Sequence, residues 1–466
     1  MNGNKIKKLI CYGAGEMAEV YADFLSFLEV DILFWVDSNK QRTGEIYLGH
    51  EVKDTEALFY HQGQILITSM YQDEIKMQLF EMGMQDRIVS LEELMKACAS
   101  GVNVTNNGSN DKVTVVIDAY DGSGDWAGTE LWALRLSKFI VNENCLFVTK
   151  GMEKNLLLDK TTIIGFSPKD VCKNMIEYME KSLPIVLIQG FGKHAMFSAA
   201  YLKLLYPDKI KIVSVLHNDT DACVRRQLVF ASSIDRVFAV SSMVRERAIK
   251  WFMRKDVTTR TQAISIPAKL EREYMKDGII RIGYGARLTR LQKRADLLID
   301  VIHKLEQTGI SYILNIAGDG ECAKEIKSYI KKEKLEEKVN LYGKITADEM
   351  KDFWIEQDIF LNMSEYEGCS LSMLEAMSFM CVPVVTNVSG VNEVVIHQMN
   401  GYVYAVGRID DAIAYIVDSC DKEKLYRMGT NAYDAVSAKC NYEDYANWWN
   451  SYINELAGGL NAEVTN

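Results

Sequence analysis

The chain has 466 residues, of which 48% are hydrophobic and 25% are charged, values typical of a folded protein with about three domains. Its formal net charge of -11 argues against nucleic acid as a partner, because phosphate binding requires a concentrated basic face. The 10 cysteines occur singly, without a CxxC pair or a zinc-type spacing. This pattern is typical of thiols in a reducing cytosol and predicts no metal site.

The N-terminal part of the chain alternates between apolar runs and helical patterns. Gly13 and Gly15 end the first apolar run after about four residues, too few for a signal peptide or a membrane span. Strands are predicted at residues 8–12, 31–36, 65–68 and 87–89, and a helix at residues 16–28. The alternation predicts a parallel sheet, and hence a small Rossmann-like domain at residues 1–100.

The first predicted strand is followed by Gly13-Ala-Gly15-Glu-Met-Ala18, and Asp37 ends the second. This is the dinucleotide fingerprint with alanine in the third place. Its glycines allow close approach of the backbone to a phosphate, and Asp37 could accept ribose hydroxyls. A reductase is not expected, since no Tyr-x3-Lys pair is present. Two interpretations stay open: the domain binds a nucleotide, a nucleotide sugar or NAD, or it only keeps the fold.

A stretch rich in Asn, Gly and Ser is interpreted as a linker at residues 101–112. Two further alternating series then predict two doubly wound halves, at residues 113–275 and 276–440, with a cleft between them. The predicted strands are 113–118, 145–148, 185–189, 211–216, 236–240 and 263–266 in the first half, and 280–286, 312–317, 339–342, 359–363 and 382–386 in the second. The segment 441–466 carries Trp448, Trp449 and Tyr452 in helical register, and we expect this helix to pack back on the first half.

The strongest motif is Glu367-Gly-Cys-Ser-Leu-Ser-Met-Leu-Glu375, which follows a predicted strand and opens a helix. The backbone N–H groups of residues 368–371 would point into the cleft at a helix N-terminus, where anions bind favourably. A phosphate could lie there, with a carboxylate on either side to accept sugar hydroxyls. Taken alone, the two glutamates are equally consistent with solvated helix residues.

A second motif, residues 285–296, carries Arg287 and Lys293 between a predicted strand and a helix. A planar guanidinium binds phosphate oxygens bidentately and a lysine adds a compact positive charge, so the two could neutralise a diphosphate. A solvated basic start of a helix is the alternative interpretation.

On these motifs the chain resembles the family 4 glycosyltransferases, retaining enzymes of the GT-B fold. The segment EGCSLSMLEAM looks like the family's E-x7-E signature, and the resemblance extends from about residue 113 to the C-terminus. It implies an α/β protein with two doubly wound Rossmann-like domains, here preceded by a third, smaller one. The first half would be the acceptor side and the second half the nucleotide-sugar donor side.

The resemblance also implies roles for individual residues. Glu375 would hold the ribose hydroxyls, and Cys369 stands where the family usually has an aromatic residue, which bears on donor-sugar preference. His217 would project into the cleft. Implied catalytic residues are Glu367, Arg287, Lys293 and His217. Implied donor-binding residues are Gly128 (in the glycine loop 124–130), Gly318, Asp319, Gly320, Tyr342, Gly368, Cys369, Ser370, Leu371 and Glu375.

Three further features concern metal binding, a loop contact and membrane contact. Asp219 and Asp221 form a DxD triplet, a metal-binding signature of another glycosyltransferase fold, but they lie in the acceptor-side half, so no metal is expected. Glu393 is expected to hold its loop rather than to do chemistry. Basic residues between 245 and 255 surround Trp251, a pattern consistent with a solvated helix or with contact with an anionic membrane surface.

Taken together, the sequence predicts a retaining glycosyltransferase that needs neither a metal nor another cofactor for transfer. It would use a nucleotide sugar, with a UDP-sugar expected, and a glycan, lipid-linked glycan or protein acceptor, in surface polysaccharide or glycoconjugate synthesis. The expected location is cytoplasmic, with peripheral contact at the inner face of the membrane as a further possibility. The alternative is a non-catalytic nucleotide-sugar-binding partner or sensor subunit, against which the joint presence of Arg287, Lys293, Glu367 and Glu375 argues.

Overall fold

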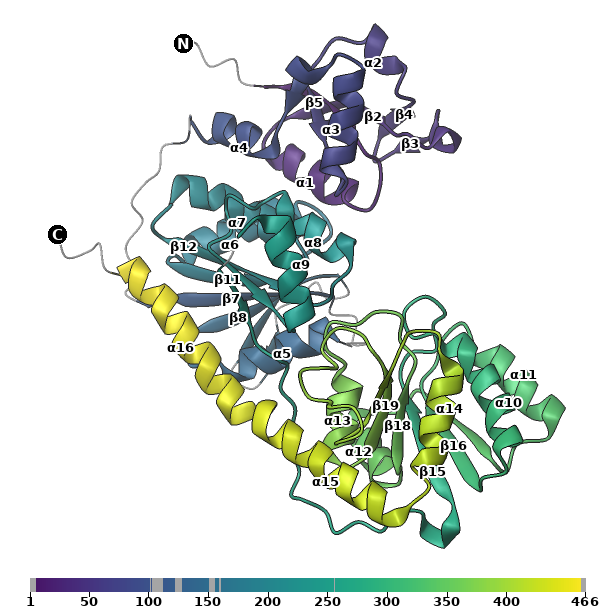
Figure 1. Cartoon of the computed structure of the whole chain (residues 1–466). Coiled ribbons are helices and arrows are strands. Elements are labelled where there is room, and N and C mark those ends of the chain that lie inside the picture. Colours follow the sequence, from purple (N-terminus) through teal and green to yellow (C-terminus); the bar gives the residue numbers. More distant parts are fainter. Residues whose placement is uncertain are drawn as a thin grey trace.

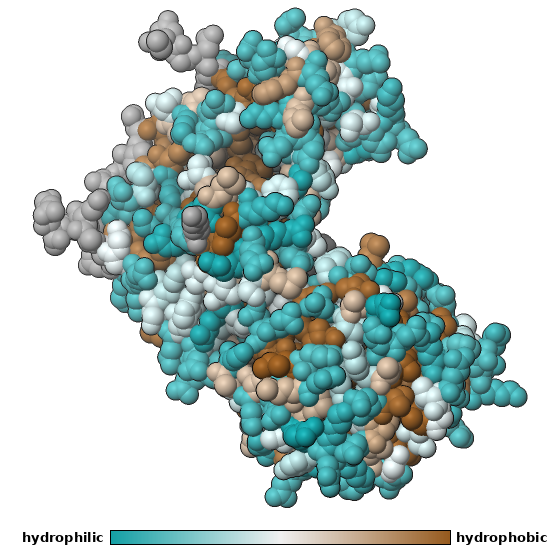
Figure 2. All heavy atoms as spheres, in the orientation of Figure 1, coloured by the Kyte–Doolittle hydropathy of each residue, from teal (hydrophilic) through white to brown (hydrophobic). Residues whose placement is uncertain are grey.

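The computed structural model describes residues 6–100, 102, 112–121, 128–150, 156–158, 161–254 and 256–461. Most of the predicted linker, residues 124–127 of the predicted glycine loop, and Lys255 of the basic segment lie outside these ranges. The described chain forms three α/β units in sequence order (Figure 1). In the space-filling view the outline is indented between the third unit and the other two (Figure 2).

The first unit is a sheet with the strand order β3-β4-β2-β1-β5-β6, in which all pairs are parallel except the β3–β4 hairpin. Its inner strands are nearly continuous apolar runs, as expected for a parallel sheet covered on both faces. The strands are β1 (Lys8–Tyr12), β2 (Asp31–Val36), β3 (Ile46–Tyr47), β4 (His50–Lys53), β5 (Ile65–Ile67) and β6 (Ile88–Val89). The helices are α1 (Ala18–Phe27), α2 (Ala57–Tyr60), α3 (Gln72–Glu81) and α4 (Leu91–Ala99).

The second unit has the strand order β14-β13-β12-β11-β7-β8-β10-β9. Its strands are β7 (Thr114–Asp121), β8 (Asn144–Lys150), β9 (Leu156–Leu158), β10 (Thr161–Gly165), β11 (Ile185–Gln189), β12 (Ile210–Leu216), β13 (Arg236–Ala239) and β14 (Val257–Thr259). Its helices are α5 (Thr129–Phe139), α6 (Val171–Lys181), α7 (His194–Leu205), α8 (Asp221–Leu228) and α9 (Ser242–Phe252). The β9–β10 hairpin was not predicted.

The strand predicted at residues 263–266 is wrong. Ile264 forms only an isolated bridge to Asn441, and its N–H donates to Cys440 O at 2.8 Å. The edge strand of the sheet is β14 instead. Ala263 and Ile264 are buried, but against the segment that crosses between the two halves rather than against a neighbouring strand. Ala263 and Ile264 are therefore apolar because they are buried, and not because they pair in a sheet.

The third unit is a parallel sheet with the strand order β17-β16-β15-β18-β19-β20. Its strands are β15 (Ile280–Gly285), β16 (Tyr312–Ala317), β17 (Val339–Gly343), β18 (Ile359–Asn362), β19 (Val382–Thr386) and β20 (Tyr402–Tyr404). Its helices are α10 (Leu298–Thr308), α11 (Ala323–Glu333), α12 (Ala347–Ile355), α13 (Leu371–Ser378), α14 (Ile409–Asp418) and α15 (Lys422–Lys439). The carboxyl ends of the second and third sheets flank the cleft described below, as is usual for binding sites of open parallel sheets.

The last helix, α16 (Tyr442–Asn461), runs from the third unit back along the second, as the yellow helix in Figure 1 shows. Its Trp449 is fully buried and contacts the rings of Trp132 and Phe238. The Asn450 side chain accepts from Val141 N at 2.9 Å and donates to Phe139 O at 2.9 Å. The helix therefore ties the end of the third unit to the core of the second.

The first unit is packed tightly on the second. Phe24 of α1 contacts the rings of Phe197 and Tyr201 on α7 edge to face. Asp23 accepts from the N–H groups of Val171 and Cys172 at 3.0 and 2.7 Å, and so caps the start of α6. The buried residues of the two units form one continuous hydrophobic cluster. We therefore expect the first unit to move with the second unit and not independently of it.

Candidate functional site

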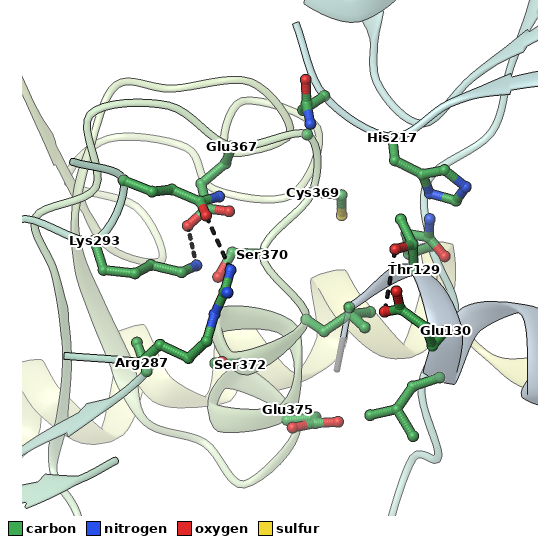
Figure 3. Close-up of a pocket in the computed structure, with 18 of the residues that line it drawn as sticks. Thr129, Glu130, His217, Arg287, Lys293, Glu367, Cys369, Ser370, Ser372 and Glu375 are labelled. Carbon is green, nitrogen blue, oxygen red and sulfur yellow. Dashed lines mark hydrogen bonds and ion pairs between the residues drawn. The ribbon is translucent and has the colours of Figure 1, made fainter. Parts of the chain in front are cut away.

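A cavity of about 610 Å³ lies between the second and third units (Figure 3). One wall comes from α5 and the end of β12, and the other from the loop after β15 and the start of α13. The cavity is lined by Gly128, Thr129, Glu130, Leu131, Arg135, His217, Asn218, Gln262, Ala286, Arg287, Gln292, Lys293, Glu367, Gly368, Cys369, Ser370, Leu371, Ser372 and Glu375.

The fold brings most of the predicted site residues into this one cavity. Those that line it are Gly128, His217, Arg287, Lys293, Glu367, Gly368, Cys369, Ser370, Leu371 and Glu375. Gly318, Asp319, Gly320 and Tyr342 are not among its lining residues, and neither are Gly13, Gly15 and Asp37 of the first unit.

Lys293 and Glu367 form an ion pair at the wall of the cavity. Lys293 Nζ lies 2.5 Å from Glu367 Oε1, which also accepts from Ser364 Oγ at 2.7 Å. The Glu367 side chain is only 7% exposed, so its charge depends on these two donors. Lys293 could leave this pair to bind another anion only if another donor or cation then compensated the buried Glu367 carboxylate.

Arg287 is exposed on the same wall and points its guanidinium toward Gln292, whose Oε1 it contacts at 3.2 Å (Figure 3). The loop that carries it rests on the Gly318-Asp319-Gly320 turn. Gly318 has φ +147°, and a Cβ there would lie 1.9 Å from Ala286 O. Leu288 N donates to Asp319 O at 2.9 Å. The turn therefore supports Arg287 from below rather than lining the cavity.

The start of α13 forms the floor of the cavity. Ser370 caps the helix by accepting from Met373 N at 3.4 Å, which leaves the helix N-terminus directed at the cavity. Gly368 lies against the second unit so closely that a Cβ would be 1.6 Å from His217 O. The two halves of the cleft therefore meet backbone to backbone at Gly368.

Cys369, at the position where the family usually has an aromatic residue, is partly buried between the two halves. Burial raises the pKa of its thiol well above the usual range. A nucleophilic thiolate is therefore disfavoured there, and the side chain acts as a small apolar contact.

His217 lies at the wall of the cavity, with its ring turned away from Lys293 and Glu367 (Figure 3). The ring contacts Trp132 edge to face, with a centroid distance of 4.6 Å. Gly190 leaves room for it, because a Cβ there would be 2.6 Å from His217 Cδ2. Burial of the ring lowers the pKa of His217 to about 3, so that the side chain is neutral at neutral pH.

This depressed pKa predicts a pH dependence of stability. The unfolded chain binds a proton at His217 below pH 6.5, whereas the folded chain does so only near pH 3, so the free energy of unfolding falls as the pH drops through this window. Between pH 7 and pH 5 we expect His217 to cost about 2 kcal/mol. Urea unfolding of wild type and His217→Gln at both pH values measures this difference. Equal losses in the two proteins would contradict the prediction.

Glu375 and Arg135 form a second ion pair inside the cavity. Arg135 Nη2, from α5 in the second unit, donates to Glu375 Oε1, on α13 in the third unit, at 3.3 Å. Burial raises the pKa of Glu375, and the neighbouring guanidinium opposes that rise. Arg135 was not predicted from the sequence. Leu131 lies four residues earlier on α5 and also lines the cavity, so helical spacing from the glycine loop was the signal that could have found it.

The DxD aspartates have separate partners. Asp219 accepts from Ser389 Oγ at 2.6 Å across the cleft, and Asp221 is paired with Arg247. Within the described ranges, no three His, Cys, Asp or Glu side chains converge as metal ligands would. Glu393 also spans the two halves, because its Oε1 accepts from Ser242 N at 2.7 Å at the start of α9.

The fingerprint loop of the first unit contains a glycine with positive φ, Gly13 at φ +115°. Asp37 Oδ2 accepts from Ala14 N at 3.2 Å, and Arg42 donates to Ala14 O and lies 3.8 Å from Asp37. Glu16 pairs with Arg226 of the second unit at 2.7 Å and with Lys193 at 3.3 Å. These side chains therefore hold the loop and tie it to the second unit.

The basic side chains around Trp251 mostly interact with other residues of this chain. The guanidinium of Arg225 lies 4.5 Å from the Trp251 ring centroid, and Arg254 pairs with Asp256 at 2.7 Å. No helix in the described part of the chain is both long enough and apolar enough to cross a membrane.

Several solved structures share this architecture. The apo form of the lipopolysaccharide outer core galactosyltransferase WaaB matches 74% of this chain and 99% of its own, with a TM-score of 0.61 and 19% identity. The Anabaena protein HepE, solved with UDP and glucose, matches 74% of this chain and 99% of its own, with a TM-score of 0.58 and 17% identity. The chain has a GT-B fold. This confirms the fold predicted from the sequence.

Family models match two parts of the GT-B chain. Residues 273–435, which hold Arg287, Lys293, Glu367 and Glu375, match the model described as Glycosyl transferases group 1. Residues 5–89 match the model described as C2185-like, N-terminal. The third unit is thus similar to group 1 glycosyltransferases.

Individual relatives are similar to different lengths of this chain. The phosphatidylinositol N-acetylglucosaminyltransferase GPI3 subunit of Saccharomyces cerevisiae is 26% identical over 197 residues, which cover 40% of this chain and 43% of that protein. The chain therefore spans less than half the length of this relative. The N-acetyl-alpha-D-glucosaminyl L-malate synthase of Bacillus anthracis is 26% identical over 304 residues, 60% of this chain and 77% of that protein.

Proposed function

We propose that the protein is a metal-independent, retaining glycosyltransferase that moves a sugar from a UDP-sugar to a glycan or glycoconjugate acceptor. The observation that carries the proposal is the convergence of Arg287, Lys293 and Glu367 with the N-terminus of α13 in one cavity of a GT-B cleft. These groups supply two cations, a helix end and a carboxylate within the space of one sugar nucleotide.

The leaving group in this proposal is the nucleoside diphosphate. Arg287, Lys293 and the backbone N–H groups at the start of α13 would stabilise the negative charge that builds on it as the glycosidic bond breaks. Entry of the diphosphate would draw Lys293 away from Glu367, whose carboxylate then faces the donor sugar. Burial of the reacting groups between the two halves would favour transfer over hydrolysis.

The comparisons support parts of this proposal. HepE was solved with UDP and glucose, which favours uridine as the base. The relatives named above act on different acceptors, so the acceptor is proposed only as a class. Retention of configuration rests on the resemblance to family 4, and a product with inverted anomeric configuration would overturn it. The non-catalytic alternative predicts binding of the donor without any turnover.

The nucleotide site can be tested by ligand-induced thermal stabilisation with UDP, GDP and ADP. A ligand at 100 times its dissociation constant adds about 2.7 kcal/mol to the free energy of unfolding. We expect UDP to stabilise the wild type and not Arg287→Ala, because Arg287 is exposed and its loss removes a phosphate contact without disturbing the core.

Arg290→Ala is the matched control for Arg287→Ala. Arg290 lies in the same loop and is exposed, but it pairs with Glu325 and does not line the cavity. It should keep the full stabilisation by UDP. If Arg287→Ala binds UDP as well as Arg290→Ala does, or if no nucleoside diphosphate stabilises the wild type, the proposed site is wrong.

A further inference from the structure

We propose that Arg135 is a binding residue of the donor site, which reaches from the second unit to hold Glu375 and to recognise the ribose hydroxyls together with it. This inference rests on the proposed function and adds a residue from the opposite half of the cleft. Its consequence is that nucleotide recognition requires both halves.

The geometry places the guanidinium inside the cavity. Arg135 lies on α5, which begins at the cavity wall with Thr129 and Glu130 and continues through Leu131. Its Nη2 donates to Glu375 Oε1 at 3.3 Å, and its side chain is 27% exposed. The other terminal nitrogen, Nη1, is buried and has no hydrogen-bond partner among the residues that the structure describes.

The buried Nη1 points to a ligand and not only to an interdomain ion pair. A buried donor without a partner is costly, and a ligand oxygen that accepts from it would remove that cost. Other contacts already join the two halves, namely Glu393 with Ser242 and Asp219 with Ser389. An ion pair that served only to hold the halves together would have no need of a second, buried nitrogen that is left unsatisfied.

The hydrogen-bonding groups of Arg135 and Glu375 complement those of a vicinal diol. Each ribose hydroxyl can donate one hydrogen bond and accept another. Glu375, when ionised, can only accept, whereas Arg135 can only donate, so the two together satisfy both functions of the diol. The guanidinium also favours the ionised form of Glu375, because it opposes the effect of burial on the pKa of that carboxyl.

The test compares UDP with its 2′,3′-dideoxy form, which lacks both ribose hydroxyls, by titration calorimetry. The wild type should prefer UDP, and Arg135→Ala should bind UDP about 10-fold more weakly while binding of the dideoxy form changes little. The discrimination between the two nucleotides is the decisive readout, because a loss of structure would weaken both equally. Unchanged discrimination in Arg135→Ala would overturn the inference.

Two further variants complete the design. Arg294→Ala is the matched control. The Arg294 side chain is 28% exposed and pairs with Glu365 at 2.8 Å, outside the cavity, so discrimination between UDP and its dideoxy form should be unaffected.

Arg135→Lys keeps the charge beside Glu375 but loses the two-nitrogen fork of the guanidinium. This variant should fold normally and still discriminate poorly between the two nucleotides. If Arg135→Lys discriminates as the wild type does, the inference is wrong. A wild type that binds no UDP would overturn the proposed function and this inference together, whereas binding without a role for Arg135 overturns only the latter.

Discussion

Gly368→Ala is expected to lower sugar transfer by at least about 100-fold, because a misplacement of about 1 Å in an active site can have that effect. The new Cβ would lie 1.6 Å from His217 O and 2.5 Å from His217 C. Both are backbone atoms at the end of β12, so they cannot move aside as a flexible side chain could. The start of α13 and the second unit must then separate, which pulls Arg287 and Lys293 of the third unit away from the opposite wall of the cavity.

The readouts for Gly368→Ala are UDP-induced stabilisation and the rate of donor-sugar release. Gly458→Ala, in α16, is the control, because a Cβ there has nothing within 4 Å. Alanine is also the better helix former, so this control should be at least as stable as the wild type. Turnover at the wild-type rate in Gly368→Ala would show that the close contact at Gly368 is not needed for the working site.

Lys293→Met is expected to lower the free energy of unfolding by about 3 kcal/mol and to abolish stabilisation by UDP. Removal of the lysine leaves Glu367 with Ser364 as its remaining named donor, and the Glu367 side chain is only 7% exposed. An uncompensated buried carboxylate is costly, because water cannot replace the lost partner. Lys338→Met is the control. It breaks an exposed pair with Glu306 at 2.7 Å, which should change stability by less than about 1 kcal/mol.

The double variant Lys293→Met, Glu367→Gln separates stability from function. Glutamine has no charge to compensate, so most of the lost stability should return. Nucleotide stabilisation should not return, because the phosphate-binding cation is still missing. If the double variant regained stabilisation by UDP, Lys293 would serve only to neutralise Glu367 and would have no direct role at the diphosphate.

The sequence was sufficient to predict those elements that a local residue pattern specifies. Continuous apolar runs between turns located β1, β2, β11, β16 and β19 to the residue, because parallel strands covered on both faces must be apolar throughout. The motif from Glu367 to Glu375 was predicted to open a helix after a strand, and α13 does begin there, at Leu371, with Ser370 as its cap. The alternation of strands and helices predicted the doubly wound halves, and the GT-B neighbours confirmed that fold.

Other features depend on partners that are far apart in the chain. The apolar character of Ala263 and Ile264 was misleading, because they are buried at the crossing between the halves and not in a sheet. The lack of a Cβ at Gly318 serves the loop of Arg287, because a Cβ there would lie 1.9 Å from Ala286 O. The short β3–β4 and β9–β10 hairpins gave no pattern long enough to detect.

The sequence by itself thus determined most of the longer strands, and which residues lie at their carboxyl ends. Only the tertiary structure decided that Arg135 meets Glu375, that Gly368 touches His217, and that Glu16 holds the first unit to the second. The physical reason is that hydrophobic periodicity is read within about ten residues of chain, whereas these contacts arise when separate sheets pack against one another. That packing depends on the shapes of whole faces, which no single segment encodes.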